Sequence, residues 1–474
     1  MTKINSKIFR EYDIRGIVGE DLSDDFAYIL GRAYAEYLQV RGAKSVVAGR
    51  DTRATSESYQ NALMRGLAEG GCEVRDMGIA IVSAIYFARE HWNIDAGVVV
   101  TASHNPPKYN GFKLCRGANS VSGDEMQEVR RITEKIAEKI AGQNQPSDIA
   151  VGKIILFPEA NKIYYDEIKK RISLKKKLKV VVDSGAAIAG IFVPKLLREL
   201  GCEVIELYSE VNPNNPPHPI DPTVMSAYGE LVKTVLENKT DVGVMFDGDA
   251  DRVGFVDEKG EAHIGDTILT FLARDYLPKN PGAKVIVEVS NSEMVAEEVL
   301  KLGGIPVWSK KGRTFINKKI QEEGALLSGE TSCHYTITKD WYDFDDAIYA
   351  MCQVLRILSE NAKTFSEIID NFPKYYSTLM YRIGVKEDEK FNLVKNIAAR
   401  FRPFCERTIE IDGIRGYTED GWFIIRASNT GPIIELRAES KSLDGLEKLK
   451  NFIKTELANF PQINLDWGRQ YDAN

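Results

Sequence analysis

The sequence lacks any long hydrophobic run. Its longest apolar runs are far shorter than the ~18 residues that a membrane-spanning helix needs, so we expect no membrane segment and no membrane partner. Residues 1–10 carry charge but no apolar core, so we also expect no secretory signal.

Cysteine is scarce, and its spacing shows no pattern. None of the six cysteines belongs to a CxxC pair or to a spacing typical of a zinc finger. They are Cys72, Cys115, Cys202, Cys333, Cys352 and Cys405. This argues against a disulfide framework and favours reduced thiols, so we expect a cytoplasmic protein.

An excess of basic residues is also missing. The chain has 62 Lys and Arg against 69 Asp and Glu, which gives a formal net charge of −7. This balance argues against a general nucleic-acid binder, although a local basic pocket for an anionic small molecule remains compatible with it. The hydrophobic content of 43% and the charged content of 28% are ordinary for a soluble globular protein.

The most informative stretch is the turn at residues 101–106, Thr-Ala-Ser-His-Asn-Pro. The apolar run 96–100 before it predicts a buried parallel strand, and Asn105-Pro106-Pro107 after it excludes a helix. We therefore expect Ser103 to be exposed at the carboxyl end of a strand, where open α/β sheets bind ligands. With His104 beside it, Ser103 is a candidate covalent centre; the alternative is a solvated loop.

Three segments of the chain resemble one another. Residues 67–74, 197–204 and 300–307 each combine the end of a helix, a glycine and the start of a strand. The strands predicted before them are 45–48, 178–182 and 284–289. This repeat predicts three strand–helix–strand units with parallel pairing. Chance similarity between α/β segments is the alternative.

Each repeat is followed by a polar loop: 101–106, 247–252 and 329–334. The chain after residue 373 differs, because it alternates in polarity and delivers a loop of its own at 426–432. We therefore predict an α/β fold of four domains around a central cleft. Three similar α/β domains with mixed, mostly parallel sheets span 1–150, 151–258 and 259–372, and a smaller α+β domain spans 373–474.

The second loop is acidic. Asp247, Asp249 and Asp251 alternate, so their carboxylates point one way if the segment is extended, and such hard oxygens suit Mg²⁺. Residues 247–258 also mimic a calcium-binding loop, but Arg252 stands where that loop needs glycine, and the flanks predict strands rather than helices. We reject the calcium loop. An acidic surface turn is the other alternative.

Two further loops carry groups that could bind a phosphorylated ligand. The loop from Arg426 offers a guanidinium, hydroxyls and an amide, which suits a phosphate; a polar hairpin is the alternative. Glu330, Ser332 and His334 alternate and could face one ligand, or could serve as loop and capping residues. Lys113 could bring an ammonium group close to Ser103.

The N-terminal stretch 9–16 is dense in charge and aromatic groups. Tyr12 and Arg15 could reach into a site, or the stretch could be a solvated arm.

Taken together, the four loops, in this order and at these distances, resemble the α-D-phosphohexomutase superfamily, most of all its phosphomannomutase/phosphoglucomutase branch. The resemblance covers essentially the whole chain, including residues 9–16 and 110–113. It implies an isomerase of carbohydrate metabolism in which Ser103 is a phosphoserine. The enzyme would convert hexose 1-phosphate (mannose or glucose) to hexose 6-phosphate through a bound hexose 1,6-bisphosphate.

The resemblance also implies roles for single residues. Mg²⁺ would be held by Ser103, as phosphoserine, with Asp247, Asp249 and Asp251. Lys113, His104 and Arg15 are the candidates for proton transfer and charge stabilisation. The implied substrate-binding residues are Tyr12, Arg252, Arg313, Glu330, Ser332, His334, Arg426, Ser428, Asn429 and Thr430.

The chain departs from the family pattern at a few positions. Gly312-Arg313 stands where the family often has Gly-His, and arginine is a poor proton carrier near neutral pH. Cys333 replaces a common glycine. The turn 183–187 lacks the usual Asn-Gly, although we expect that turn to be structural.

Alternatives to a mannose/glucose mutase are a phosphoglucosamine mutase, a sugar-phosphate phosphatase and a sugar-phosphate binding protein. Asn429-Thr430 favours the mannose/glucose branch by resemblance. We expect a small-molecule sugar phosphate as the partner, no nucleic acid, and a monomer or homodimer.

Overall fold

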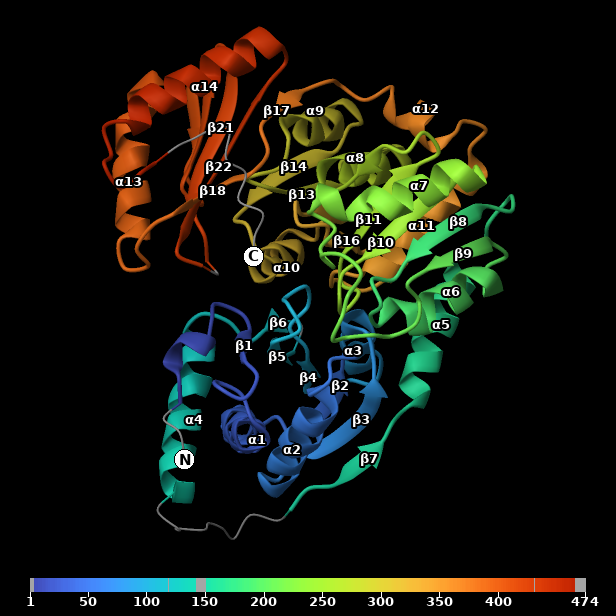
Figure 1. Cartoon of the computed structure of the whole chain (residues 1–474), viewed down its shortest axis with the longest axis vertical. Coiled ribbons are helices and arrows are strands. Elements are labelled where there is room, and N and C mark those ends of the chain that lie inside the picture. The colour runs from blue at the N-terminus through green and yellow to red at the C-terminus, as the bar shows by residue number, and fades with distance from the viewer. Residues whose placement is uncertain (1–3, 118, 142–150, 430, 465–474) are drawn as a thin grey trace. The chain divides into compact units, whose positions relative to one another are not determined.

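The computed structural model describes residues 4–117, 119–141, 151–429 and 431–464 (Figure 1). The chain forms two compact units. Unit 1 comprises residues 1–264 and 332–368, and unit 2 comprises residues 265–331 and 369–474. The stretch predicted as the third domain therefore contributes to both units, and the four proposed domain boundaries stay a prediction.

The first sheet of unit 1 has the strand order β1-β5-β4-β2-β3-β7, with β6 beside β5. Its strands are β1 (Ile14–Ile17), β2 (Ser45–Arg50), β3 (Glu73–Ile79), β4 (Ala96–Val100), β5 (Tyr109–Arg116), β6 (Asn119–Ser120) and β7 (Ile154–Leu156). Its helices are η1 (Ser6–Ile8), α1 (Asp24–Gln39), α2 (Ser56–Glu69), α3 (Val82–His91) and α4 (Asp124–Ala141). Apolar side chains of α1, α2 and α4 share one buried cluster with β2, β4 and β5, so these helices cover one face of the sheet.

Strand β4 has different neighbours on its two sides. It pairs in parallel with β2, as predicted, but antiparallel with β5. The antiparallel register places Val99 opposite Lys113 and Val100 opposite Phe112. Lys113 on β5 therefore lies close to the carboxyl end of β4, where the turn that carries Ser103 begins.

Helices α1 and α2 cross at two glycines. A Cβ atom on Gly31 would lie 2.2 Å from the carbonyl oxygen of Leu63, and one on Gly66 would lie 2.2 Å from that of Tyr28. Real Cβ atoms do not approach backbone oxygens so closely, so only glycine permits this crossing.

We expect Gly66→Ala to lower the free energy of unfolding by about 1–3 kcal/mol, because the added methyl group forces the two helix backbones apart. The helix propensity gained by alanine, about 1 kcal/mol, offsets only part of this. The matched control is Gly229→Ala, where a Cβ would meet nothing within 4 Å. Urea unfolding compares the two variants, and equal stabilities would contradict the crossing argument.

The second sheet of unit 1 has the order β12-β11-β10-β8-β9. Its strands are β8 (Lys179–Asp183), β9 (Glu203–Leu207), β10 (Val242–Phe246), β11 (Val253–Asp257) and β12 (Ala262–His263). The other elements are α5 (Glu159–Arg171), α6 (Ala189–Glu199), η2 (Met225–Tyr228), α7 (Gly229–Asn238), β16 (Tyr335–Ile337), α11 (Ala347–Glu360) and α12 (Phe365–Ile369). Helix α7 packs Leu231 and Val235 against Val181 and Met245 of the sheet.

Unit 2 contains a parallel group of strands in the order β14-β13-β15 and an antiparallel sheet in the order β17-β22-β21-β20-β19, with β18 beside β22. The strands are β13 (Lys284–Glu288), β14 (Ile305–Ser309), β15 (Leu327–Gly329), β17 (Tyr376–Ser377), β18 (Tyr381–Gly384), β19 (Arg407–Ile409), β20 (Ile414–Thr418), β21 (Gly421–Ala427) and β22 (Ile433–Ser440). The helices are α8 (Asp266–Tyr276), η3 (Leu277–Lys279), α9 (Glu293–Lys301), α10 (Arg313–Glu323), α13 (Lys390–Phe401), η4 (Arg402–Phe404) and α14 (Leu443–Leu457). Helices α13 and α14 share one apolar core with the antiparallel sheet.

The predicted repeat is present in the structure. Strands β2 and β3, β8 and β9, and β13 and β14 are three parallel pairs, each connected through a helix. Gly71, Gly201 and Gly303 follow the helices with φ of +91°, +94° and +79°. These positive angles are favoured by glycine alone, which explains why the repeat could be recognised. The α/β fold with mixed, mostly parallel sheets is confirmed.

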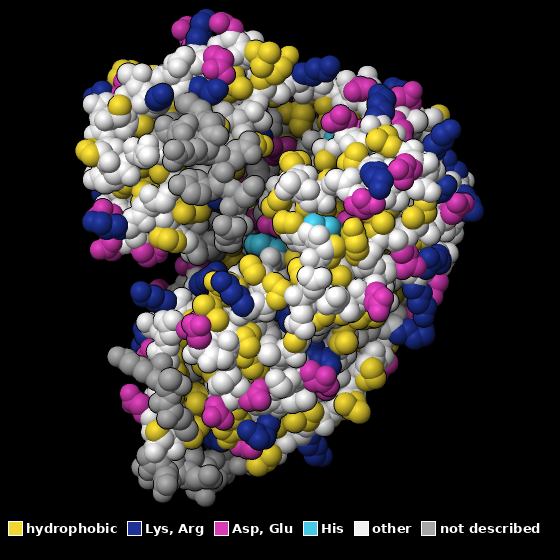
Figure 2. Space-filling view, viewed as in Figure 1, with side chains coloured by type: hydrophobic (Ala, Val, Ile, Leu, Met, Phe, Trp, Pro, Cys, Tyr) yellow, Lys and Arg dark blue, Asp and Glu magenta, His cyan; other side chains and the backbone are white. Residues whose placement is uncertain are grey.

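Charged side chains of both signs are interspersed over the face in Figure 2 rather than gathered by sign. Among the described residues, no helix combines the length and the apolar character that crossing a membrane requires.

Candidate active site

Ser103 lies in a tight turn directly after β4, with a left-handed φ of +52°. Its backbone N–H donates to Thr101 Oγ1 at 2.9 Å. The residue is only 1% exposed, so the prediction of an exposed serine is wrong. The acidic loop covers it: Gly248 lies so close that a Cβ there would be 2.3 Å from the Ser103 carbonyl oxygen.

The Ser103 hydroxyl group faces a carboxylate and an imidazole. Oγ donates to Asp247 Oδ2 at 2.6 Å and lies 3.1 Å from His104 Nδ1. His104 Nε2 in turn lies 3.8 Å from Asp221 Oδ2. Burial, together with the nearby Arg252 guanidinium, holds the pKa of His104 well below its usual value. The hydroxyl therefore has two proton acceptors within reach.

The acidic loop is a turn and not an extended strand. The three carboxylates therefore do not converge through alternation along an extended segment, and that part of the prediction is wrong. Ala250 has a φ of +56°, and Asp247 Oδ1 accepts hydrogen bonds from the backbone N–H groups of Asp251 and Arg252 at 3.2 Å each. The turn brings one ligand atom from each of Asp247, Asp249 and Asp251 to within 4.8 Å of one another.

These three carboxylates fit a divalent cation. All are buried, and Oδ1 of Asp249 has no hydrogen-bond partner among the described residues. Burial, reinforced by Asp249 and Asp251, raises the pKa of Asp247 well above its usual value. A hard cation would supply the charge and the ligand contacts that this group of oxygens needs.

Lys113 is the side chain that bridges two of the carboxylates. Its Nζ lies 2.7 Å from Asp249 Oδ2 and 2.5 Å from Asp251 Oδ2. Thr101 Oγ1 donates to the same oxygen of Asp249 at 3.0 Å. The antiparallel pairing of β4 and β5 explains this position, which the sequence indicated only as proximity along the chain.

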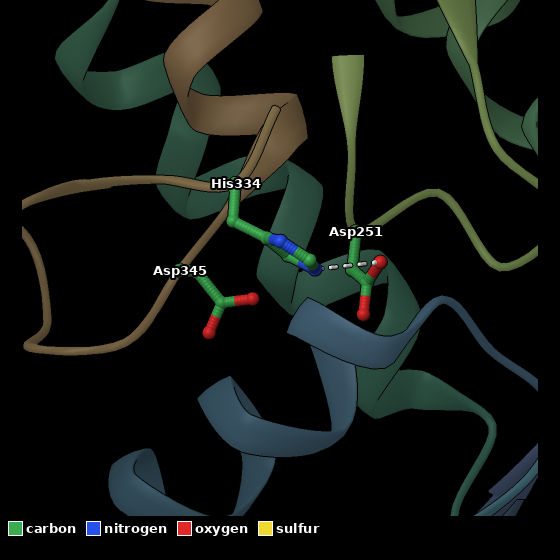
Figure 3. Close-up of side chains that lie close together, drawn as sticks. All are labelled: Asp251, His334 and Asp345. Carbon is green, nitrogen blue, oxygen red and sulfur yellow. Dashed lines mark ion pairs between the residues drawn. The ribbon is translucent and has the colours of Figure 1, made fainter. Parts of the chain in front are cut away.

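His334 lies between two carboxylates, those of Asp251 and Asp345 (Figure 3). Its Nε2 is 3.4 Å from Asp251 Oδ1, and its Nδ1 is 3.1 Å from Ser332 Oγ. Strand alternation does not produce this arrangement, because the segment turns at Cys333, whose φ is +72°. A glycine would adopt that angle without strain.

Two arginines and a tyrosine complete the site in unit 1. Arg15 Nη1 donates to Asn105 Oδ1 at 2.5 Å, and its Nε pairs with Asp13. Arg252 Nη1 lies 3.6 Å from Asp221 Oδ1, and its Nε lies 3.8 Å from Asp247 Oδ2. Although burial acts in the opposite direction, Asp13 raises the pKa of Arg15 and Asp221 raises that of Arg252. Tyr12, which is half-buried, adds a smaller contribution to both.

In unit 2, Arg426 is buried between two carboxylates. Its Nε lies 2.8 Å from Asp412 Oδ2, and its Nη1 lies 2.7 Å from Glu435 Oε2. Lys311 Nζ is 3.1 Å from the same oxygen of Glu435. Although burial acts in the opposite direction, Lys311 and Arg426 hold the pKa of Glu435 down to about 2. The carboxylates of this cluster hold two positively charged side chains, Arg426 and Lys311, in a fixed arrangement.

The remaining predicted residues of unit 2 lie near this cluster or on neighbouring elements. Ser428 is buried, and Asn429 Nδ2 donates to the carbonyl oxygen of Lys311 at 3.5 Å. Arg313 is 9% exposed and begins α10. Glu330 is buried; burial and, more weakly, Glu330 raise the pKa of its neighbour Glu288 to about 7. Thr430 lies outside the described residues.

Comparison with known proteins gives the chain its family. The models for phosphoglucomutase/phosphomannomutase match it in order: alpha/beta/alpha domains I, II and III at residues 6–140, 162–260 and 264–376, and the C-terminal domain at 380–456. The chain belongs to the phosphoglucomutase/phosphomannomutase family. It is an enzyme, an intramolecular phosphotransferase.

Relatives match this mutase over nearly its full length. A phosphomannomutase/phosphoglucomutase of Pseudomonas aeruginosa is 36% identical over 458 residues, covering 95% of this chain and 96% of that protein. A phosphoglucomutase of Neisseria gonorrhoeae is 35% identical over 469 residues, covering 98% and 99%. A crystal structure of a family protein from Burkholderia thailandensis superposes with a TM-score of 0.89 at 32% identity, covering 98% and 99%.

Sequence reasoning missed several charged residues that contact the predicted ones or lie beside them. In unit 1 they are Asp221 and Asp345, and in unit 2 they are Lys311, Asp412 and Glu435; Asp345 and Glu435 are buried, and the other three are partly buried. No local spacing marks most of them, because their partners are distant in the chain; Lys311 is 124 residues from Glu435. The one local signal is the basic run 310–313, which directly precedes and begins α10.

Proposed function

We propose that this mutase interconverts hexose 1-phosphate and hexose 6-phosphate, with mannose and glucose as the sugars. It acts in the cytoplasm through a phosphoserine at Ser103 and a bound hexose 1,6-bisphosphate. The observation that carries the proposal is the buried Ser103 hydroxyl, 2.6 Å from one of three clustered carboxylates.

The reaction is a transfer between two oxygens. The bond between phosphorus and Ser103 Oγ breaks as a bond forms between phosphorus and the free hydroxyl oxygen of the hexose phosphate. The sugar hydroxyl loses its proton, and Oγ regains one. In the return step the bond between the other phosphorus and its sugar oxygen breaks as that phosphorus bonds to Oγ. The released sugar oxygen gains a proton, and Asp247 Oδ2 and His104 Nδ1 are the acceptors within reach of the proton that Oγ loses.

The cation we propose is Mg²⁺, held by Asp247, Asp249, Asp251 and the phosphoserine. When bound, it neutralises charge on the phosphoryl group being transferred. The protein's own contribution is positional. Lys113 Nζ pairs with the Oδ2 atoms of Asp249 and Asp251. Among the described residues, Oδ1 of Asp249 has no hydrogen-bond partner, so it is available to the cation.

The other predicted residues receive binding roles in this proposal. Arg426 and its loop residues Ser428, Asn429 and Thr430 hold the phosphate that is not reacting, as guanidinium groups do for phosphates. Glu330, Ser332 and His334 contact the sugar hydroxyls. The anionic ligand is further stabilised by Tyr12, Arg15, Arg252 and Arg313.

Burial of Ser103 favours transfer to a sugar over hydrolysis. At 1% exposure, its hydroxyl is shielded from bulk water, and exclusion of water suppresses hydrolysis of a phosphoryl intermediate.

The test is ³¹P NMR of the purified protein with Mg²⁺ and a trace of glucose 1,6-bisphosphate. Mannose 1-phosphate, glucose 1-phosphate and glucosamine 1-phosphate are supplied in separate tubes. We expect 6-phosphate signals to grow from mannose and glucose without free phosphate. Free phosphate alone would indicate a phosphatase, a faster glucosamine reaction would indicate that branch, and no reaction would contradict the proposal.

We expect Asp249→Asn to weaken binding of Mn²⁺, a spectroscopic substitute for Mg²⁺, by at least about tenfold, because it removes one of three ligand charges. Mn²⁺ titration followed by electron paramagnetic resonance measures this without turnover. The control is Asp241→Asn, which changes the aspartate directly before the first residue of β10, at the end of that strand away from the acidic loop. Equal Mn²⁺ affinity in both variants would exclude Asp249 as a ligand.

A further inference from the structure

Arg53 contacts the backbone of the turn that carries Ser103, although the mechanism above does not use it. It follows β2, in the stretch 50–53. Its guanidinium Nη2 donates to the carbonyl oxygens of Ser103 at 2.8 Å and Asn105 at 2.5 Å. Its Nη1 donates to those of Pro106 at 3.1 Å and Tyr109 at 3.0 Å. One side chain thus binds four carbonyl groups of residues 103–109.

The turn needs such a support for two reasons. Pro106 and Pro107 have no backbone N–H, so the segment has few donors of its own. Ser103 adopts a left-handed φ of +52°, a region disfavoured for any residue with a side chain. A planar guanidinium that supplies several donors in one fixed geometry can hold such a segment in place.

Arg53 is itself fixed by buried groups. Its Nε lies 3.3 Å from Asp51 Oδ2, and its backbone N–H donates to Asp51 Oδ1 at 2.9 Å. Asp51 is 2% exposed and also accepts from Ser56 Oγ, which accepts in turn from Asn110 Nδ2. The chain of contacts joins the end of β2, the start of α2 and β5. Arg53 therefore rests on the rigid part of the sheet.

We propose that Arg53 is a positioning residue for phosphoryl transfer, which holds the Ser103 turn so that Oγ stays directed at Asp247. This inference rests on the proposed function. Because the proposed function gives Arg53 no contact with the substrate, we expect its loss to alter the placement of the reacting oxygen and not the binding of the sugar phosphate. A displacement of about 1 Å at a reacting group lowers rates by about 100-fold.

The test compares Arg53→Ala, Arg53→Lys and the control Arg50→Ala. Arg50 is the last residue of β2 and belongs to the same stretch 50–53, but its guanidinium pairs with Glu57 at 3.3 Å and not with the turn. We expect kcat to fall about 100-fold in Arg53→Ala with KM within about threefold of wild type. Added guanidinium chloride should raise the kcat of Arg53→Ala at least about tenfold above its value in sodium chloride of equal concentration. Arg53→Lys should remain impaired, because an ammonium group cannot reproduce the planar fork.

A second readout does not depend on turnover. Amide hydrogen exchange in residues 101–110 should become faster in Arg53→Ala and stay unchanged in Arg50→Ala. Unchanged kcat and exchange in both Arg53 variants would overturn the proposal, as would a kcat loss that guanidinium does not reverse. If wild type shows no mutase activity but Arg53→Ala still accelerates exchange, the proposed function fails while the anchoring role of Arg53 stands.

Discussion

Ser103→Ala is expected to lower mutase kcat by at least about 10⁴-fold, the scale seen when a covalent nucleophile is removed. The methyl group cannot carry a phosphoryl group, and among the residues that the structure describes no other hydroxyl makes the 2.6 Å contact with Asp247. The fold should persist, because the substitution keeps the backbone and removes one buried hydroxyl, at a cost of about 1–3 kcal/mol. A coupled assay of glucose 6-phosphate formation measures the rate, and thermal unfolding checks the fold.

Ser184→Ala is the matched control for this experiment. Ser184 is also a fully buried serine directly after a parallel strand, β8, but its Oγ has no hydrogen-bond partner among the described residues. We expect it to keep wild-type turnover. Wild-type activity in Ser103→Ala, or an acid-stable phosphate label on the variant after incubation with labelled bisphosphate, would exclude the phosphoserine at Ser103.

The framework around Ser103 could be predicted because it depends on local patterns. Uninterrupted apolar runs correspond to β4 (Ala96–Val100) and β10 (Val242–Phe246), which are buried throughout. Strands buried on both faces lack polar alternation, so such short runs are informative. The three glycines that precede β3, β9 and β14 marked the repeat for an equally local reason, namely their left-handed conformation.

The details of the site could not be predicted in the same way. The exposure of Ser103 depends on Gly248, which is far along the chain, and its burial arises only when the acidic loop folds over the turn. The carboxylates of Asp247, Asp249 and Asp251 converge through a turn at Ala250, whereas the alternation argument assumed an extended chain. Residue types indicated the correct chemistry, and long-range packing determined how the groups meet.

Arg53 shows the same division. The stretch 50–53 is recognisable as a polar loop after a strand, but nothing nearby indicates that its guanidinium binds carbonyl groups about 50 residues later. Backbone carbonyl groups have no sequence signature, so contacts to them become visible only in the structure.

The largest effect on stability is expected at Arg415, inside unit 2. This arginine is fully buried, and its Nη1 donates to the carbonyl oxygens of Val289 and Asn291 at 2.8 and 2.7 Å. Its Nη2 pairs with Glu293 at 2.6 Å, and the guanidinium carbon lies 3.4 Å from the centre of the Trp422 ring. A single side chain thus ties residues 289–293 to β20 and β21.

We expect Arg415→Met to lower the free energy of unfolding of unit 2 by about 3–5 kcal/mol. Methionine fills much of the space but leaves Glu293 without its charge partner and two buried carbonyl groups without a donor. Urea unfolding followed by tryptophan fluorescence is suited to the measurement, because Trp308 and Trp422 both face the guanidinium.

Arg407→Met separates the buried contacts of Arg415 from a general effect of removing an arginine. Arg407 lies on the adjacent strand β19, and its guanidinium rests on the Tyr417 ring at 4.8 Å while its side chain is exposed. Exposed cation–π contacts contribute about 0.5–1 kcal/mol, so we expect a correspondingly small change. Equal losses in the two variants would mean that the buried hydrogen bonds of Arg415 contribute nothing beyond its ring contacts. A large loss confined to Arg415→Met would show that the charge is retained because Val289, Asn291 and Glu293 require its donors.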